Sequence, residues 1–497
     1  MTLEDVLAVA GGSPVELTTE AVERIERSRA VVDAAIERGD AIYGVTTGVG
    51  HARNERLPHE ALDAMQPILV EMHLGAWGDP MPTEVVRAGM AVRLSGFARG
   101  GAGVSVAVAR ALAEMLNHQI HPIIPRYGSV GAGDLGQLAY LGRALLGKGV
   151  VEWRGETVAA AEALSRAGIS PVGMRPKDAL AVISSNALMV GHGVKLSAAV
   201  AELLALADLV AATSMEAIGA NPSFIDSAVA GARGSPGQVE VSQRLREALA
   251  GSERTDSAMA SVQDPISFRV IPQVHGACRD VLDRFVSDLE KELNATSDNP
   301  MVDVESERIL SNGNFHAMTL VVTAESLNLA LAHLGLLSER RCGQLWDAVV
   351  SSMGEGSEGA PPLEEGAPPY VAGLALRYPA AARYTRLRQL AQPVSLDVPP
   401  LSLSVEDHAN NGSEVLWSTR AIIEIVTEIL TVETLIAFAR LSVSGPGGRL
   451  GAGTGRVVDL VGDVVGGLPH GTLPDETHAR LMTELTSRLD DFGNRVR

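Results

Sequence analysis

The sequence predicts a mainly α-helical protein with a long central helical bundle and a smaller N-terminal domain of mixed structure. Alanine-rich apolar stretches with helical spacing predict the long helices, at 177–218, 270–293, 315–350 and 413–443. The chain has 497 residues, of which 46% are apolar, so it holds more material than one ordinary core needs. Helices that are apolar over most of their surface must pack against one another, which favours a bundle that oligomerisation buries further.

The N-terminal part is predicted to mix helices, loops and one hairpin. A Thr-Thr-Glu start and apolar spacing of three and four residues predict a helix over 18–39. Glycines and threonines make 41–54 a loop, which carries Tyr43. The remaining elements follow in order: helices over 64–79, 83–100 and 135–147, and a small hairpin that enters a helix over 149–164.

The change from mixed short elements to long apolar helical stretches at about residue 176 predicts two domains. Residues 1–175 form the N-terminal domain, and residues 176–497 form the helical bundle. The first domain carries Tyr43, His73 and the glycine-rich loop Gly128–Gly142. The Gly-, Pro- and Glu-rich segment 354–370 in the second domain is expected to be a long surface loop or a lid.

Charge and cysteine content restrict the kind of protein. A net charge of −19 disfavours nucleic acid and anionic membranes as partners. No uninterrupted apolar run reaches the roughly 18–20 residues of a membrane span. Cys278 and Cys342 are the only cysteines, which excludes a disulfide scaffold and a Cys-x-x-Cys metal site. Together with an acidic N-terminus that does not resemble a signal peptide, they indicate a cytoplasmic protein.

Polar residues that could carry chemistry lie in otherwise apolar helices or in glycine-rich loops. The chain has no His-Glu-x-x-His, Cys/His cluster or Gly-x-Ser-x-Gly motif, so zinc protease and serine hydrolase chemistry lack their parts. Each polar residue alone is more often a hydrogen-bonded core residue than part of a site. Together they describe a cavity with a phenol base, an anion-binding arginine and a glutamate–histidine pair. The candidates are Tyr43, His73, Ser184, Asn186, Gln263, Arg269, Asn314, His316, Glu406 and His408.

In their order and spacing these motifs resemble those of the aromatic amino acid lyase family, histidine ammonia-lyases in particular. The matching motifs are YGVTTGVG from Tyr43, GSVGAGDL from Gly128, QDPISFR from Gln263, SDNP from Ser297, GNFHA from Gly313 and EDH from Glu406. The resemblance implies an ammonia-lyase/fumarase-like helical fold and a homotetramer whose active sites are shared among chains. It also implies elimination of an amine from a small amino acid.

The glycine-rich loop departs from the family pattern. In the family, an Ala-Ser-Gly tripeptide in this loop cyclises and dehydrates to a methylidene-imidazolone, the electrophile that turns ammonia into a leaving group. Here the loop reads Gly131-Ala132-Gly133-Asp134, and the serine is missing. Dehydration needs a β-hydroxyl in the middle of the tripeptide, which Ala132, Gly133 and Asp134 do not supply. We therefore expect neither this cofactor nor a metal, the alternative being a processed serine hidden in the loop.

Two further positions that serve the amino group in the family also differ. Ser184 stands where the family has an asparagine, although Asn186 is close by, and Ile266 stands where the family has a tyrosine. An isoleucine is compatible with an apolar pocket for methyl groups. The change is selective, because it affects the parts that handle the amine.

The positions that resemble carboxylate and ring binders are kept. The resemblance assigns Arg269, assisted by Gln263, to the substrate carboxylate, for which a planar guanidinium is well shaped. It assigns His73 and Glu406 to the neighbourhood of an imidazole ring, and Tyr43 to removal of the β-proton. Phe315 is a further expected substrate contact.

The missing electrophile suggests a substrate class. A trimethylammonium group leaves as a neutral amine and needs no electrophile, so base catalysis and alignment of the breaking bonds remain. This combination resembles the ergothionase branch of the family, which removes trimethylamine from ergothioneine to give thiol-urocanate; hercynine is an equally open substrate. One alternative is a conventional histidine or aromatic amino acid ammonia-lyase or aminomutase that uses the imidazolone. Another is a non-catalytic protein that binds imidazole acids.

Overall fold

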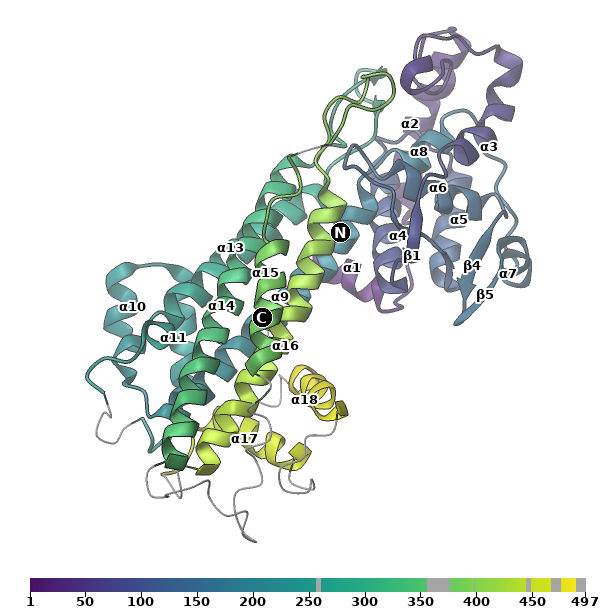
Figure 1. Ribbon diagram of the computed structural model, residues 1–497. Coiled ribbons are helices and arrows are strands. Elements are labelled where there is room, and N and C mark those ends of the chain that lie inside the picture. Colours follow the sequence, from purple (N-terminus) through teal and green to yellow (C-terminus); the bar gives the residue numbers. More distant parts are fainter. Residues whose placement is uncertain are drawn as a thin grey trace. The chain divides into compact units, whose positions relative to one another are not determined.

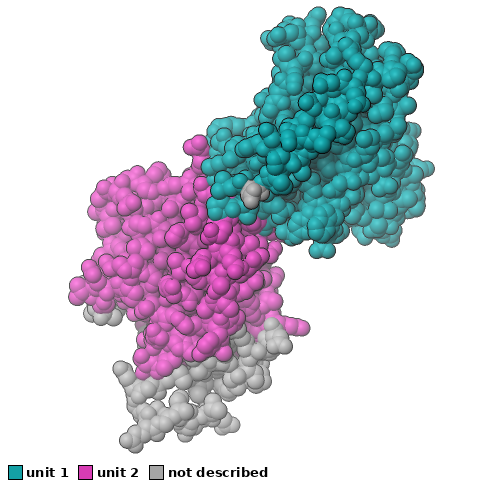
Figure 2. All heavy atoms as spheres, turned by 45° about the horizontal axis from the view of Figure 1, so that its top comes forward, with its two compact units in different colours: residues 1–196, 285–324, 393–417 teal, residues 197–284, 325–392, 418–497 magenta. Residues whose placement is uncertain are grey.

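A computed structural model describes residues 1–255, 261–354, 375, 377–396, 398–443, 448–465 and 475–488. The residues gather into two compact units, each built from three stretches of the chain (Figure 2). Unit 1 comprises Met1–Leu196, Phe285–Ala324 and Pro393–Trp417, and unit 2 comprises Ser197–Arg284, Glu325–Gln392 and Ser418–Arg497. The expected division into continuous domains 1–175 and 176–497 stays a prediction. Nearly all of the predicted loop 354–370 lies outside the described residues.

Unit 1 combines short helices with small antiparallel sheets (Figure 1). Its helices are α1 (Leu3–Ala10), α2 (Thr19–Glu37), α3 (Leu62–Met72), α4 (Thr83–Ala98), α5 (Val106–Asn117), α6 (Leu135–Leu145), α7 (Ala160–Arg166) and α8 (Asp178–Ile183). One sheet pairs β1 (Trp77–Pro80) with β3 (Pro125–Tyr127), a second has the order β2 (Ile120–Pro122), β4 (Val150–Trp153), β5 (Glu156–Ala159), and a third pairs β6 (Met301–Asp303) with β7 (Arg308–Leu310). The predicted helix over 18–39 and the predicted hairpin with its following helix over 149–164 are confirmed.

Capping side chains explain where the first helices begin. At α1, Thr2 accepts a hydrogen bond from the Asp5 amide (3.2 Å), and the Asp5 carboxylate accepts one from the Thr2 amide (2.8 Å). At α2, Thr18 accepts a hydrogen bond from the Ala21 amide (3.2 Å). These contacts satisfy amides that have no partner within the helix.

The helix predicted over 64–79 is wrong in its second half. α3 ends at Met72, and the residues from Trp77 onward pair with β3 as strand β1. Gly78 has a φ of +93°, and a Cβ there would lie 2.6 Å from Cδ2 of Tyr127. A glycine in this conformation packs its bare backbone against the ring, which a helix would not allow.

The long helices of the predicted bundle are present, and the mainly helical fold is confirmed. They are α9 (Ala187–Ile218), α13 (Ile271–Leu293), α14 (Met318–Gly354) and α16 (Gly412–Val443). Each has some of its residues in unit 1 and the others in unit 2. The shorter helices of unit 2 are α10 (Ser227–Arg233), α11 (Pro236–Ala248), α12 (Ile266–Arg269), α15 (Arg377–Leu390), α17 (Ala452–Val465) and α18 (Asp475–Ser487).

The stretch 177–218 is not one continuous helix. α8 ends at Ile183, and α9 begins at Ala187 after a buried break of three residues. Ser185 within the break accepts a hydrogen bond at its carbonyl from the Asp134 amide (2.6 Å). The apolar pattern of the sequence continues through this break, because the helices on both sides of it and the break itself are buried. The pattern alone therefore does not reveal the break.

Two helical stretches, 178–218 and 318–352, are long and apolar enough by length and composition to cross a membrane. In their most apolar windows, 78% and 50% of the residues are buried inside the protein. Core helices of globular proteins meet the same criterion, so these two stretches alone give no argument for a membrane span.

A buried ion pair lies in the core of unit 2. The guanidinium of Arg341 donates to the Glu433 carboxylate through Nε (2.6 Å to Oε1) and Nη2 (2.9 Å to Oε2). Both side chains have no solvent exposure. The hydroxyls of Ser214 and Ser338 each donate to the same carboxylate at 2.6 Å. The charge on Glu433 is therefore compensated by one cation and two hydroxyl donors.

Candidate active site

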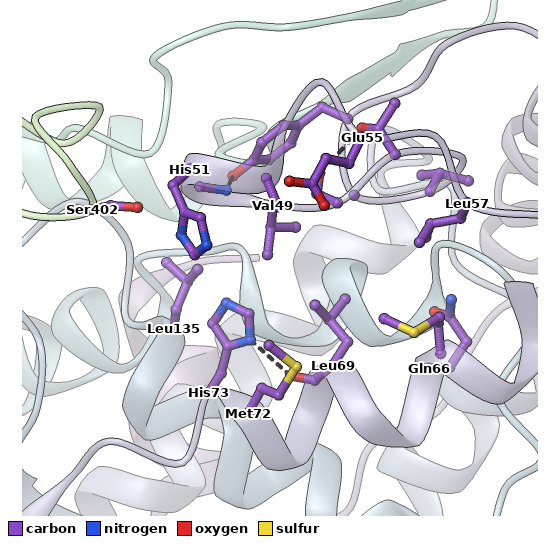
Figure 3. A pocket seen from close by; sticks show the side chains of 18 of the residues that line it. Val49, His51, Glu55, Leu57, Gln66, Leu69, Met72, His73, Leu135 and Ser402 are labelled. Carbon is purple, nitrogen blue, oxygen red and sulfur yellow. Dashed lines mark hydrogen bonds between the residues drawn. The ribbon is translucent and has the colours of Figure 1, made fainter. Parts of the chain in front are cut away.

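A cavity of about 370 Å³ in unit 1 gathers three of the predicted site residues, Tyr43, His73 and Glu406. Its walls come from the loop that begins at Tyr43, from α3, from Leu135 at the start of α6 and from the segment that carries Ser402 and Glu406 (Figure 3). These segments are far apart in the sequence, so the fold brings the predicted phenol, imidazole and carboxylate to one place. Their roles in substrate binding and catalysis stay predictions.

Tyr43 is held by a loop that folds back on itself. The amide of Gly50 donates a hydrogen bond of 3.1 Å to the phenol oxygen of Tyr43. Gly44 has a φ of +64°, and a Cβ there would lie 2.5 Å from Cδ2 of Leu180, so the loop can approach α8 only with glycine at this position. The amide of Gly48 donates to the carbonyl of Glu55 (3.0 Å), which closes the loop.

His73 follows the last residue of α3, and its tautomer is determined by a carbonyl group. Its Nδ1 lies 2.7 Å from the carbonyl oxygen of Leu69. Because a carbonyl oxygen only accepts, Nδ1 carries the hydrogen, and Nε2 of the neutral ring is left as an acceptor. Figure 3 shows the imidazole ring of His51 above that of His73, with Leu135 beside them. The pocket therefore contains two imidazole rings, only one of which the sequence predicts.

Glu406 enters the pocket from a tight turn. The backbone groups of Leu401 and Glu406 exchange two hydrogen bonds, of 2.8 and 3.3 Å. Three residues within this turn, Ser402, Leu403 and Ser404, have φ values of +50°, +54° and +61°, respectively. This left-handed run is uncommon for residues with side chains. It brings Ser402, which is partly buried, and Glu406, which is exposed, together at the pocket.

The prediction missed two ionisable residues of the pocket, His51 and Glu55. Both follow Tyr43 in the same loop, so a sequence signal existed in the polar residues directly after the YGVTTGVG motif. Among the described residues that line the pocket, none is a lysine or an arginine. Glu55 and Glu406 therefore make it an acidic pocket, whose apolar wall includes Met65, Met72, Leu57 and Leu69.

Asp134, in the glycine-rich loop, caps the start of α9. It is 1% exposed, and one carboxylate oxygen accepts the amides of Leu188 (3.0 Å) and Met189 (3.1 Å). The other oxygen accepts the hydroxyl of Ser129 (2.9 Å). Burial raises the pKa of Asp134 from its ordinary value of 3.8 to about 6, against the opposing effect of these hydrogen bonds. Leu135, the next residue, lines the pocket, so the loop ends at the pocket wall.

The glycines of this loop are needed for its conformation. Gly131 and Gly133 have φ values of +83° and +85°. A Cβ on Gly131 would lie 1.9 Å from Oδ1 of Asn410, and the carbonyl of Val130 accepts the amide of Asn411 (2.8 Å). Ala132 between the glycines is partly buried. The loop is thus bound to the chain segment that follows Glu406.

Ser184 and Asn186 do not line this pocket, because both are engaged elsewhere in unit 1. The hydroxyl of Ser184 donates to the carbonyl of Asn299 (3.2 Å), and the side-chain amide of Asn186 donates to the Glu292 carboxylate (3.0 Å). Both are buried, at 6% and 4% exposure. Phe315, also in unit 1, is partly buried and likewise lies outside the residues that line the pocket.

The histidines of the GNFHA and EDH motifs form a pair. Nε2 of His316 lies 3.0 Å from Nδ1 of His408, so one of the two nitrogens donates to the other. Nδ1 of His316 is 3.5 Å from the side-chain amide of Asn410. Among the described residues, no three His, Cys, Asp or Glu side chains are grouped so as to hold a metal ion.

Gln263 and Arg269 line a second cavity, of about 250 Å³, in unit 2. Nε of Arg269 donates to the backbone carbonyl of Asp264 (2.9 Å), which orients the guanidinium within the QDPISFR segment. Ile266 is 60% exposed and lies at a neighbouring cavity together with Pro265. The predicted carboxylate binders are thus close to each other and do not line the cavity of Tyr43.

Sequence comparisons place these features among known proteins. A protein-family model described as aromatic amino acid lyase matches residues 1–463. The histidine ammonia-lyase of Chloroflexus aurantiacus (strain J-10-fl) is 36% identical over 490 residues, 95% of this chain and 92% of the relative. That of Geobacillus thermodenitrificans is 36% identical over 435 residues, 87% of this chain and 85% of the relative.

Solved structures with the same fold include three different activities. Ergothionase from Treponema denticola, in complex with desmethyl-ergothioneine sulfonic acid, gives a TM-score of 0.91 at 26% identity and covers 99% of this chain and 98% of its own. Histidine ammonia-lyase from Trypanosoma cruzi gives a TM-score of 0.86 at 26% identity, and the match covers 99% of this chain and 94% of that protein. Pantoea agglomerans phenylalanine aminomutase gives a TM-score of 0.88 at 26% identity, and the match covers 99% of this chain and 98% of that protein.

Proposed function

This chain belongs to the aromatic amino acid lyase family and is a carbon–nitrogen lyase, and on that premise we propose that it eliminates trimethylamine from a histidine-derived betaine without a methylidene-imidazolone. The proposed substrates are ergothioneine, which would give thiol-urocanate, and hercynine. The observation that carries the proposal is the loop Gly131-Ala132-Gly133-Asp134, which has no serine where the family builds its electrophile.

The residues of this loop do not fit the imidazolone group. Ala132 and Gly133 have no hydroxyl to lose, and Asp134 is committed to capping α9. The hydroxyl of Ser129, the other serine of the loop, donates to the Asp134 carboxylate (2.9 Å) and lies 3.3 Å from the Gly133 carbonyl. The proposed mechanism therefore contains no step through this group.

In the proposed elimination, Tyr43 takes the β-proton. Its phenolate oxygen forms a bond to the proton on Cβ, the C–H electron pair becomes the Cα=Cβ bond, and the Cα–N bond breaks. The nitrogen leaves with the electron pair of the Cα–N bond as neutral trimethylamine, so no acid is needed to protonate it. The Gly50 amide donates to the phenol oxygen of Tyr43 at 3.1 Å, and this hydrogen bond stabilises a negative charge there.

The substrate ring is assigned to the side of the pocket with His73 and Glu406. Nε2 of His73 is an acceptor, because Nδ1 donates to Leu69, and the carboxylate of Glu406 is a second acceptor. Arg269 and Gln263 are assigned to the substrate carboxylate. Because they line a cavity of unit 2, the proposal takes them from another copy of the chain, in a homotetramer with shared active sites.

A conventional histidine ammonia-lyase is the second candidate. It is favoured by the curated relatives, which carry that name at 36% identity over most of both chains. It requires a serine processed within the loop. A protein that binds imidazole acids without turnover is the third. The expected compartment remains the cytoplasm, and Cys278 and Cys342 are both free and buried.

The test is a substrate panel in which trimethylamine and ammonia are measured together. The purified protein is incubated with ergothioneine, hercynine and histidine, and its intact mass is measured. We expect trimethylamine from at least one betaine, no ammonia from histidine, and a mass equal to the unmodified sequence. Ammonia from histidine, with a mass equal to that of the sequence plus one serine residue minus two waters, would establish the conventional enzyme instead. Binding of these compounds without either amine would favour the non-catalytic protein.

A further inference from the structure

We propose that Glu55 is a specificity-determining residue that recognises the quaternary ammonium group of the substrate beside Tyr43. This inference rests on the proposed function and extends it, because it names the group that selects a betaine over a neutral ligand. The ionisable side chains that line the pocket are Tyr43, His51, Glu55, His73 and Glu406, with no lysine or arginine among the described lining residues.

The backbone of Glu55 is fixed by hydrogen bonds within the loop, and the residue is exposed. Its carbonyl accepts the amide of Gly48 (3.0 Å), and its own amide donates to the carbonyl of Ala52 (2.9 Å). The adjoining Arg56 pairs with Thr47 in a β-bridge. Figure 3 shows the Glu55 carboxylate directed from this loop toward the interior of the pocket, across from α3.

Glu55 is also available for a ligand. The neighbouring guanidinium of Arg56 donates instead to the carbonyl of Gly39 (2.8 Å). In the described part of the chain, no lysine or arginine lies within ion-pair distance of Glu55. A carboxylate that faces a pocket without a protein counter-ion attracts a cationic ligand.

The surrounding wall suits a methylated cation. A quaternary ammonium has no N–H to donate, so its recognition depends on Coulomb attraction and on contact with apolar or aromatic surface. Met65, Met72 and Leu57 supply apolar surface in the same pocket, and Tyr43 supplies an aromatic ring. A primary ammonium would instead require acceptors in direct contact with its three N–H groups.

Charge flow in the elimination predicts how Glu55 acts. The nitrogen loses its positive charge as it leaves, so attraction by Glu55 is strongest in the bound substrate and weaker in the transition state. Such an interaction lowers KM without raising kcat. A merely structural role for Glu55 would change both parameters or the thermal stability of the protein.

The experiment measures binding by calorimetry, separately from turnover, and each protein named below also carries Tyr43→Phe so that bound hercynine is not consumed. The ligands are hercynine and its carbon isostere, in which a tert-butyl group replaces the trimethylammonium group. The proteins are wild type, Glu55→Gln and the control Glu60→Gln, an exposed glutamate nearby that does not line the pocket. We expect wild type and the control to prefer hercynine, and Glu55→Gln to lose about five- to tenfold of that preference, as expected for one partly screened charge pair.

The outcomes separate this inference from the proposed function. The inference is overturned if Glu55→Gln keeps the wild-type preference for hercynine over the isostere. It is also overturned if Glu55→Gln lowers the affinity for both ligands equally, a result that would assign Glu55 to the ring. The affinities test the inference whether or not the wild type releases trimethylamine. Release of trimethylamine tests the proposed function alone. Where turnover occurs, a raised KM at unchanged or higher kcat supports the inference, and a lowered kcat with unchanged KM contradicts it. A Glu55→Asp variant that regains cation preference rules out a loss caused by misfolding.

Discussion

The amide of Gly50 donates a hydrogen bond of 3.1 Å to the phenol oxygen of Tyr43. Gly50 has a φ of +56°, and a Cβ there would lie 2.6 Å from the hydroxyl oxygen of Ser402. The donor is therefore a main-chain group whose position depends on a close glycine contact. This geometry makes the oxygen of Tyr43 the atom to test first.

Replacement of Tyr43 by phenylalanine removes the proposed base and keeps the ring. We expect trimethylamine release to fall by about 10²–10⁴-fold, the usual contribution of a positioned general base, while betaine affinity stays nearly unchanged. Amine release and calorimetric binding measure the two effects. Tyr140→Phe is the matched control, because its hydroxyl donates to the Ala76 carbonyl (3.0 Å) and it does not line the pocket. A fully active Tyr43→Phe protein would remove Tyr43 from the mechanism.

Gly131→Ala tests the conformation of the glycine-rich loop. The new Cβ would need space that Oδ1 of Asn410 occupies, at 1.9 Å, in addition to the strain of a positive φ. We expect a loss of roughly 2–4 kcal/mol in the free energy of unfolding, measured by denaturant titration. Gly155→Ala is the control, because Gly155 has the same φ of +83° and nothing within 4 Å of the added Cβ. It should lose only about 1–2 kcal/mol, and equal losses would argue against the Asn410 contact.

Asp134→Asn tests the buried carboxyl through the pH dependence of stability. Burial raises the pKa of Asp134 from 3.8 to about 6, so between these values the native state binds a proton that the unfolded chain has released. Stability from this group is therefore highest below about pH 4 and falls as the pH rises through about 6, by roughly 3 kcal/mol.

The asparagine variant cannot titrate at this position. The free energy of unfolding of wild type minus that of Asp134→Asn should decrease between about pH 4 and about pH 6.5 and be constant above, in urea titrations at each pH. A difference that does not change with pH would show that Asp134 titrates alike in the folded and unfolded states. Asp5→Asn, at the exposed cap of α1, is the control for a carboxyl that solvent reaches.

The Arg341–Glu433 pair predicts a non-additive stability cycle. Arg341→Met alone leaves the Glu433 carboxylate buried without its cation, which costs about 3–5 kcal/mol. The double variant Arg341→Met/Glu433→Gln removes that charge, so it should be destabilised less than the single variant, and unfolding of all four cycle members measures the coupling. Additive costs would mean that the two charges are independently solvated, in conflict with their complete burial.

Much of the fold could be predicted because burial dictates the sequence pattern of long helices. The stretches that became α13, α14 and α16 carry helical periodicity over nearly their whole length. The break between α8 and α9 could not be predicted, because it depends on Asp134, more than 50 positions away in the sequence, which caps α9 through the amides of Leu188 and Met189. The strand at Trp77 likewise depends on pairing with Tyr127.

The candidate site was predictable where motifs resemble a family, and not where only the fold decides. Tyr43, His73 and Glu406 share one pocket, as the resemblance implied. His51 and Glu55 have no motif of their own, and they reach the pocket because the loop closes through Gly48 and Glu55. The sequence predicts Ser184 as a substrate contact, and in the structure its hydroxyl donates a hydrogen bond to the Asn299 carbonyl.

The acidic character of the pocket also bears on how a turnover ends. The proposed substrate enters with a cation and a carboxylate, and the unsaturated acid that remains after elimination keeps only the carboxylate. Glu55 then faces a product that no longer carries a cation, while the product carboxylate keeps its assigned partner Arg269 and trimethylamine departs uncharged until water protonates it. The attraction that Glu55 supplies to the betaine is therefore absent for the acid, so the product should bind more weakly than the substrate and compete poorly with fresh betaine.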